Sequence, residues 1–333
     1  MEMTKSKRGV SFAVAAGFLA LAGVFGLAAV PYVERFQLGI RAVLGIYGCF
    51  LVSLTLALAP GVQALRPRIR ARLDGKLIWL LPLLWCSPYL LYAAGTGDFR
   101  WAAVARLLGL GALLVAIYRL MPIRDLARFA WQDLVVAVCL IAALMTHQLI
   151  GIWNLPVNLD FMGRLFLISV AAGSWVFLRP VPKLGYEFRF SWAVGRAAAS
   201  NFLLFIVIAI PAGLALRFIE WHPLHKGMVD FAVTFLEIFL FIALLEEMFF
   251  RGFLQTLISE NMRSPRAGQV LISCLFGLFH ILHAPFPNWK YVLLATVAGW
   301  FYGSAFMQSG TLMASALTHA LVDTTWRTFF SKS

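Results

Sequence analysis

Charged residues are scarce in this sequence. Only 13% of its 333 residues are charged, and Asp and Glu together number 15. Soluble globular chains contain about 25% charged residues, which keep their surfaces in water. The shortage therefore excludes a water-soluble protein of this length, and with it a large soluble domain for catalysis or nucleic-acid binding.

Cysteine is also rare, and its spacing forms no motif. The sequence has four cysteines, each alone in an apolar segment and without CxxC spacing. This pattern excludes a disulfide framework and a thiolate metal site, so we interpret the thiols as small buried hydrophobic groups. They are Cys49, Cys86, Cys139 and Cys274.

Acidic residues are far fewer than basic ones. The 28 Lys and Arg residues give a formal net charge of +13, which in a soluble chain would suggest a nucleic-acid partner. Here the basic residues cluster in alternate loops, and no basic tract of useful length is interleaved with aromatic residues. We therefore expect no nucleic-acid partner.

Apolar residues make up 61% of the chain, against roughly 45 to 50% in soluble proteins. A membrane-spanning helix needs roughly 20 apolar residues, so the chain has room for about ten or eleven spans. We predict an all-α polytopic membrane protein with helices near residues 9–33, 41–60, 77–95, 101–118, 131–152, 161–178, 198–218, 231–257, 269–284, 290–307 and 310–327.

The basic residues also predict the orientation of these spans. The side that holds the N-terminus carries 17 of the 28 Lys and Arg residues, and the opposite side carries eight. Because cytoplasmic loops are enriched in Lys and Arg, the N-terminus is predicted to be cytoplasmic. We expect a multi-pass protein of a bacterial-type inner (plasma) membrane.

The segment 179–196 is the longest break in hydrophobicity, with two prolines and four basic residues. We place a domain boundary there, between an N-terminal accessory region (1–190) and a second domain (195–330). Polar residues inside the predicted spans form a pattern only after this break. Ionisable groups at membrane depth are costly, and they indicate a functional site.

Three short motifs carry that pattern, and each is predicted to lie near the middle of its own helix. The first is Glu246-Glu247-Met-Phe-Phe-Arg251. Glu247 and Arg251 are four residues apart and share a helix face, so they can pair, whereas Glu246 points about 100° away and can take another role.

The second motif, Phe276-Gly-Leu-Phe-His280, and the third, His319-Ala-Leu-Val-Asp323, supply histidines. His319 and Asp323 share a helix face, so the aspartate can orient the imidazole or add its own oxygen to a site. Counted along the predicted helices, Glu246, His280 and His319 all lie roughly 14 to 17 Å from the cytoplasmic face. They can therefore meet in one plane.

A buried carboxylate with two imidazoles can support two kinds of chemistry. Glu246 can act as a general base on water while the histidines donate hydrogen bonds to the water or to an oxyanion. Alternatively, Glu246, His280 and His319 can be ligands of Zn²⁺, with water in the remaining position. Both lead to amide hydrolysis, and the spacing does not choose between them.

In order, these motifs resemble the CAAX prenyl endopeptidase type II and bacteriocin-processing (CPBP) superfamily of intramembrane proteases. The resemblance covers about residues 195–330. It implies a helical protease core, a catalytic glutamate at Glu246, a supporting Glu247 and Arg251, and site histidines at His280 and His319. Asp323 stands where asparagine is common in the family, and an ionised aspartate cannot donate a hydrogen bond.

We therefore predict a CAAX-type intramembrane endopeptidase, of the glutamate or metallo type, acting on a membrane-tethered peptide such as a lipidated or CAAX-like one. The predicted site comprises Glu246, Glu247, Arg251, His280, His319 and Asp323. Two alternatives stay open: a proton-coupled transporter that uses the same groups as a relay, and a non-catalytic immunity or scaffold protein. The chain has no convincing internal repeat, which argues against the transporter.

Overall fold

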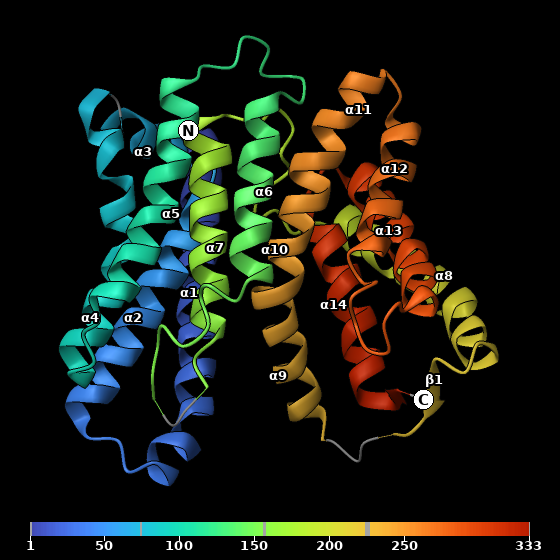
Figure 1. Ribbon diagram of the computed structural model, residues 1–333, viewed down its shortest axis with the longest axis horizontal. Coiled ribbons are helices and arrows are strands. Elements are labelled where there is room, and N and C mark those ends of the chain that lie inside the picture. Colours follow the sequence, from blue (N-terminus) through green and yellow to red (C-terminus); the bar gives the residue numbers. More distant parts are fainter. Residues whose placement is uncertain (1, 74, 156–157, 224–226, 333) are drawn as a thin grey trace. The chain divides into compact units, whose positions relative to one another are not determined.

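The computed structural model describes residues 2–73, 75–155, 158–223 and 227–332, and these are helical along most of their length (Figure 1). The chain forms two compact units. The N-terminal unit consists of residues 1–124 and 130–180, and the C-terminal unit consists of residues 125–129 and 181–333. The assignment of an accessory and a catalytic domain stays a prediction.

The N-terminal unit contains six of the predicted apolar runs as helical segments. Its elements are α1 (Glu2–Arg35), α2 (Ile40–Leu58), η1 (Ala59–Gly61), α3 (Arg66–Arg72), η2 (Gly75–Leu80), α4 (Leu81–Thr96), α5 (Trp101–Leu120), α6 (Trp131–Met145), α7 (Phe161–Gly173) and η3 (Ser174–Leu178). Helices α2 and α4 pack closely, because Gly45 and Gly95 face each other with no side chain between them. Small residues commonly permit such contacts between membrane helices.

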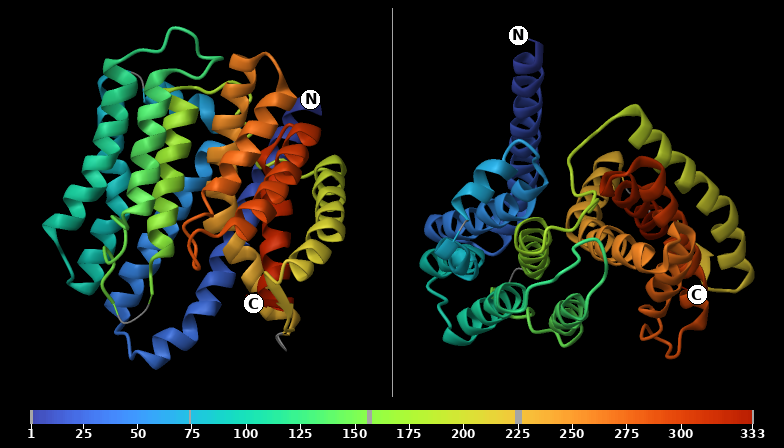
Figure 2. Two further views of the ribbon diagram at one scale, coloured as in Figure 1. Left: turned by 45° about the vertical axis from the view of Figure 1, so that its right-hand side comes forward. Right: turned by 90° about the horizontal axis from the view of Figure 1, so that it is seen from above.

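The C-terminal unit contains the other five runs. Its elements are α8 (Trp192–Ala215), β1 (Ile219–Trp221), α9 (Met228–Ile238), η4 (Phe239–Ala243), α10 (Leu244–Glu247), η5 (Met248–Gln255), α11 (Thr256–Met262), α12 (Pro265–Leu278), α13 (Trp289–Ser309), α14 (Leu312–Phe329) and β2 (Phe330–Lys332). The elements from α9 to α11 follow one another without a break, and η4 and η5 are π-helical turns within this long helix. Helix α8 lies along α13 and α14 (Figure 2).

Polar caps determine where the helices of the C-terminal unit begin. Ser191, Ser264, Asn288 and Thr311 precede α8, α12, α13 and α14, and each side-chain oxygen accepts a hydrogen bond from a backbone N–H of the first turn. Such caps satisfy donors that have no partner within the helix. The two short strands pair antiparallel, with Glu220 opposite Ser331.

Seven helical segments among the described residues are long and apolar enough to cross a membrane: Ala16–Arg35, Ile40–Gly61, Gly75–Thr96, Trp101–Leu120, Phe161–Leu178, Trp192–Ala215 and Met228–Met262. The prediction of an all-α polytopic membrane protein is confirmed. The remaining four predicted runs are also helical, but α6 and α12 are shorter. Helices α12 and α14 carry buried polar residues, including Gln269, Ser273, Thr318 and His319, which lower their hydropathy.

One expectation about the N-terminal unit is wrong. Asp133 at the start of α6 is fully buried, and Arg179 binds it through both Nε (2.9 Å) and Nη2 (3.0 Å). The Tyr118 hydroxyl donates to the same carboxylate at 3.1 Å. A polar cluster therefore exists within the N-terminal unit, and its members are far apart in the sequence, so no local motif reveals it.

Candidate active site

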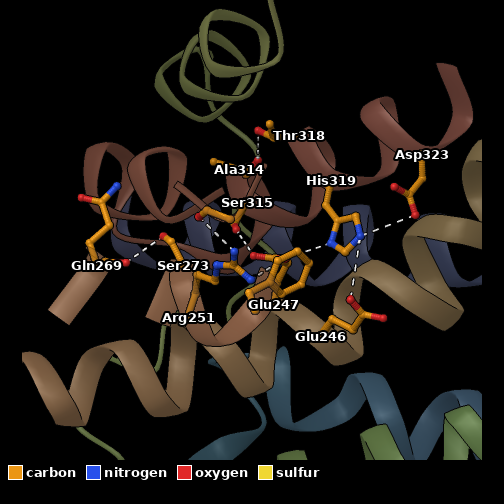
Figure 3. Close-up of polar contacts among 12 residues, drawn as sticks. Glu246, Glu247, Arg251, Gln269, Ser273, Ala314, Ser315, Thr318, His319 and Asp323 are labelled. Atoms are coloured by element: carbon orange, nitrogen blue, oxygen red, sulfur yellow. Dashed lines mark hydrogen bonds and ion pairs between the residues drawn. The ribbon is translucent and has the colours of Figure 1, made fainter. Parts of the chain in front are cut away.

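The long helix of the C-terminal unit places three predicted site residues beside α14 (Figure 3). Glu246 and Glu247 end α10, and Arg251 lies in the π-helical turn η5 that follows. π-Helical turns are rare and frequently occur at functional sites. His319 and Asp323 lie on α14, facing the two glutamates (Figure 3).

Glu247 is held at the centre of this cluster. Its side chain is fully buried and accepts hydrogen bonds from Arg251 Nη1 (3.1 Å), from His319 Nδ1 (2.8 Å) and from the Ser315 hydroxyl. The predicted pair between Glu247 and Arg251 is confirmed. A buried carboxylate needs such partners, because the loss of water is otherwise unfavourable.

Arg251 is equally buried and connects Glu247 to α13. Its Nη2 donates to the carbonyl of Gly299 at 3.0 Å. The guanidinium also lies over the ring of Phe276, 4.6 Å from its centroid, and near the ring of Tyr302 at 5.3 Å. Cation–π contacts of this kind stabilise a desolvated guanidinium.

His319 lies between carboxylates on both sides of its ring. Its Nδ1 is bound to Glu247, and its Nε2 is 3.6 Å from Asp323 Oδ2 and 4.0 Å from Glu246 Oε2. The predicted proximity of His319 and Asp323 is confirmed, although 3.6 Å is too long for a direct hydrogen bond. Asp323 was predicted to orient the imidazole, but the carboxylate that binds it directly is that of Glu247.

The two adjacent glutamates differ sharply in exposure. The side chain of Glu246 is 32% exposed, and that of Glu247 is fully buried. Asp323 is partly exposed as well, at 25%. The site therefore combines one enclosed carboxylate, which binds the imidazole and the guanidinium, with two partly exposed carboxylates near His319 Nε2.

His280 departs from its predicted position in the middle of a helix. Helix α12 ends at Leu278, and residues 279–283 continue as turns that include the bond from His280 N–H to the Gly277 carbonyl (2.9 Å). The prolines at 285 and 287 explain why a helix cannot extend to 284, since they lack an N–H and restrict the preceding residue.

The turn after α12 nevertheless places His280 against the same aromatic cluster. The ring centroids of His280 and Phe276 are 5.0 Å apart, and those of Phe276 and His319 are 5.9 Å apart. His280 Nδ1 lies 2.8 Å from the Phe276 carbonyl oxygen. Because a carbonyl only accepts, Nδ1 carries the hydrogen, and Nε2 is an acceptor when the ring is neutral.

The alternative ligand set for zinc does not fit this arrangement. Within the described part of the chain, no group of three or more His, Cys, Asp and Glu side chains is placed to hold a metal ion. Both imidazoles contact the Phe276 ring, and His319 directs Nδ1 to a carboxylate that Arg251 already binds. Zn²⁺ sites require ligand atoms about 2.0 to 2.2 Å from one ion, so we derive no step through a metal.

Sequence reasoning missed several residues that build the site. Ser315 lies one helical turn before His319 on α14, and that spacing was the available signal. Tyr302 stacks on His319, Tyr291 contacts the ring of His280, and the Gly299 carbonyl binds Arg251. These three belong to α13, which has no Asp, Glu, His, Lys or Arg near its middle to indicate a site.

A comparison with protein families identifies the segment that carries this site. Residues 228–325 match the family Type II CAAX prenyl endopeptidase Rce1-like. The match confirms the resemblance seen in the motifs. It spans less than a third of the chain, from the start of α9 into α14, and includes all six predicted site residues. Comparisons with curated proteins and with solved structures give no match.

Two conclusions follow from the match and the fold together. The chain is an integral, multi-pass membrane protein. Its segment 228–325 is similar to the Type II CAAX prenyl endopeptidase Rce1-like family.

Proposed function

We propose that this protein is an intramembrane endopeptidase in which Glu246 activates water for attack on a peptide bond. The observation that carries the proposal is the contrast between the adjacent carboxylates. Glu247 is enclosed by Arg251, Ser315 and His319, whereas Glu246 is partly exposed and lies 4.0 Å from His319 Nε2. A general base must be accessible to the water that it deprotonates.

Glu246 carries the proton through the reaction. Its carboxylate takes a proton from water as the water oxygen bonds to the carbonyl carbon of the scissile peptide. The resulting tetrahedral intermediate then collapses, the C–N bond breaks, and Glu246 returns the proton to the leaving amine. The products are a carboxylic acid and an amine, and no other reactant is needed.

His280 positions the attacking water in this mechanism. Its Nδ1 is committed to the Phe276 carbonyl, so Nε2 accepts a hydrogen bond from the water. The water is then held by two acceptors, the Glu246 carboxylate and the imidazole, which directs a lone pair of its oxygen toward the substrate.

His319 stabilises the oxyanion. With Nδ1 donating to Glu247, a ring that is also protonated at Nε2 can donate to the developing negative charge. Asp323, at 3.6 Å from Nε2, helps to retain that hydrogen before substrate binds. Glu247 and Arg251 orient the imidazole and touch no reacting atom.

The decisive experiment compares proteolysis with ion flux in liposomes that contain the purified protein. We expect cleavage of a membrane-tethered peptide, loss of cleavage in Glu246→Gln, and no proton or ion flux. Glu237→Gln is the matched control, because Glu237 lies on the same long helix at an exposed position. Ion flux without cleavage would favour the transporter, and neither activity would favour a non-catalytic protein.

The proposed orientation places substrate access on the cytoplasmic side, in a bacterial-type inner membrane. The segments 61–76 and 179–196 hold nine of the 28 basic residues, and we expect both to be cytoplasmic. Single cysteines introduced there in a variant without the native cysteines should react with impermeant reagents only from the cytoplasmic side. Labelling of both segments only from outside would reverse the orientation.

A further inference from the structure

Helix α13 contributes no residue to the predicted site, yet it touches three members of that site. Tyr291 contacts the ring of His280, the Gly299 carbonyl accepts from Arg251, and Tyr302 contacts the ring of His319. Each contact reaches a different element, because His280 follows α12, Arg251 lies in η5 and His319 lies on α14.

The contact between Tyr302 and His319 is a parallel stack. The ring centroids are 4.5 Å apart, and the planes differ by 14°. Both residues are buried, with exposed fractions of 1% and 3%. The tyrosine ring stacked on the imidazole restricts rotation about χ2 of His319. Tyr302 therefore sets the orientation of the imidazole plane and the directions of its two nitrogens.

Tyr291 makes the corresponding contact with His280. The centroids are 4.5 Å apart, with the planes inclined by 57°. Tyr291 is held in turn by the rings of Trp326, at 5.3 Å, and Phe218, at 5.2 Å. His280 thus packs against the ring of Tyr291, which in turn contacts α14 and the connection between α8 and β1.

The two tyrosines share one face of α13, because eleven residues correspond to about three helical turns. The helix itself is held firmly against α12. A Cβ atom at Gly277 would lie 2.6 Å from the Val292 carbonyl, and one at Gly299 would lie 3.1 Å from Ser273 Cα. Such close backbone contact leaves little freedom for α13 to shift, so its side chains are placed accurately.

We propose that α13 is the positioning helix of the site, with Tyr302 setting the ring plane of His319 and Tyr291 setting that of His280. This inference rests on the proposed protease function, since it assigns the two rings to orienting an oxyanion donor and a water acceptor. The tyrosines act through the histidines and contact no reacting atom.

The first test separates the ring of Tyr302 from its hydroxyl. Tyr302→Leu removes the stack, and we expect kcat to fall about 10²-fold with KM unchanged, since small misplacements of catalytic groups cost this much. Tyr302→Phe keeps the ring and should keep kcat near the wild-type value. For Tyr291→Leu we expect a smaller loss, about tenfold, because the planes are inclined, and Tyr291→Phe should again rescue.

A control variant accounts for the general cost of losing a buried aromatic ring. Tyr186 is fully buried in the same unit and packs against Phe188, so Tyr186→Leu should keep kcat. A kcat in Tyr302→Leu that equals that of Tyr186→Leu would overturn the proposal. Equal losses in Tyr302→Phe and Tyr302→Leu would also overturn it, because they would assign the effect to the hydroxyl. If Tyr302→Leu does not fold, Tyr302→Met replaces it.

A second measurement does not depend on proteolysis. NMR of ring-labelled histidine should show the His319 resonance, identified by its loss in His319→Gln, shifted by the stacked ring. The shift should persist in Tyr302→Phe and disappear in Tyr302→Leu. If the His319 shift disappears in Tyr302→Leu but the wild-type protein cleaves no tethered peptide, only the proposed function is contradicted. An unchanged His319 resonance in Tyr302→Leu of a cleaving protein would contradict the positioning role alone.

Discussion

Each unit of the molecule contains a buried carboxylate–arginine pair, and the surroundings of the two pairs differ. In the N-terminal unit, Arg179 binds both oxygens of Asp133, which also accept from the Tyr118 hydroxyl and the Ala130 N–H. In the C-terminal unit, Arg251 gives one Nη to Glu247 and the other to the Gly299 carbonyl. Glu247 thereby retains acceptor capacity for Ser315 and His319.

The difference shows that burial of an ion pair does not by itself indicate function. A guanidinium that binds one carboxylate at both oxygens fixes that carboxylate in place. A carboxylate that shares its oxygens among a guanidinium, a hydroxyl and an imidazole transmits their positions to the imidazole. The preceding residue differs too: Gln132 precedes Asp133, and the partly exposed Glu246 precedes Glu247.

The largest expected effect comes from replacing Glu246. Glu246→Gln places a glutamine before the buried Glu247, as Gln132 precedes the buried Asp133. We expect proteolysis to fall about 10² to 10⁴-fold, since the amide cannot accept the proton from water. The measurement is turnover of a tethered peptide by purified, reconstituted protein. Turnover close to that of Glu237→Gln would remove Glu246 from the mechanism.

Breaking each pair in turn compares their roles. Arg179→Met and Arg251→Met each leave a buried carboxylate without its partner, and each should destabilise the fold by about 3 to 5 kcal/mol. Unfolding of the detergent-solubilised protein measures this loss. Folded Arg179→Met should keep its kcat, whereas folded Arg251→Met should lose activity because His319 is no longer held. Equal kcat values for the two variants would show that both pairs are structural.

A smaller effect is expected at Asp323, the residue that differs from the common family asparagine. Asp323→Asn should lower kcat about tenfold, because an amide is a weaker partner for the ring that Glu247 orients. The assay is run with and without a chelator, and we expect no response to chelation. A variant that is faster than wild type would show that this position donates to the oxyanion. Inhibition by the chelator would restore the zinc alternative.

The smallest effect on activity is expected at Ser315. Ser315→Ala removes one donor from the Glu247 carboxylate and should cost about 1.5 to 3 kcal/mol of stability, with only a modest decrease in kcat. Thr324→Val is a suitable control, because the Thr324 hydroxyl donates to the Ala320 carbonyl of its own helix. A loss in Ser315→Ala as large as that in Glu246→Gln would indicate that the serine takes part in the chemistry.

Local patterns predicted the helices and the contacts within them. Apolar runs correspond to helical segments because a helix satisfies its own backbone hydrogen bonds inside a membrane. The contacts Glu247–Arg251 and His319–Asp323 follow from four-residue spacing. Contacts between different helices could not be predicted from local sequence patterns. Asp133 and Arg179 are 46 residues apart, and Tyr302 precedes His319 by 17.

The position of His280 shows a different limit. The apolar run around it continues past Leu278, so hydropathy gives no sign that the helix stops there. The break results from the turn that leads to the two prolines, and it brings the imidazole against Tyr291. Hydropathy reports which residues avoid water, but it does not report how the backbone turns to bring them together.

The π-helical turns on either side of Glu246 and Glu247 affect how the site tolerates a change in chain length. A π-turn has a wider hydrogen-bonded loop than an α-turn, with bonds from residue i to i+5, so it holds about one residue more. Deleting one residue from η4 would leave an ordinary α-turn, and everything after it would keep nearly its present direction relative to α9. The same deletion between Tyr291 and Tyr302, within the regular helix α13, would rotate one tyrosine by about 100° relative to the other. Single-residue deletions within η4 should thus be tolerated more often than deletions within α13, a difference that a deletion scan of both segments would expose.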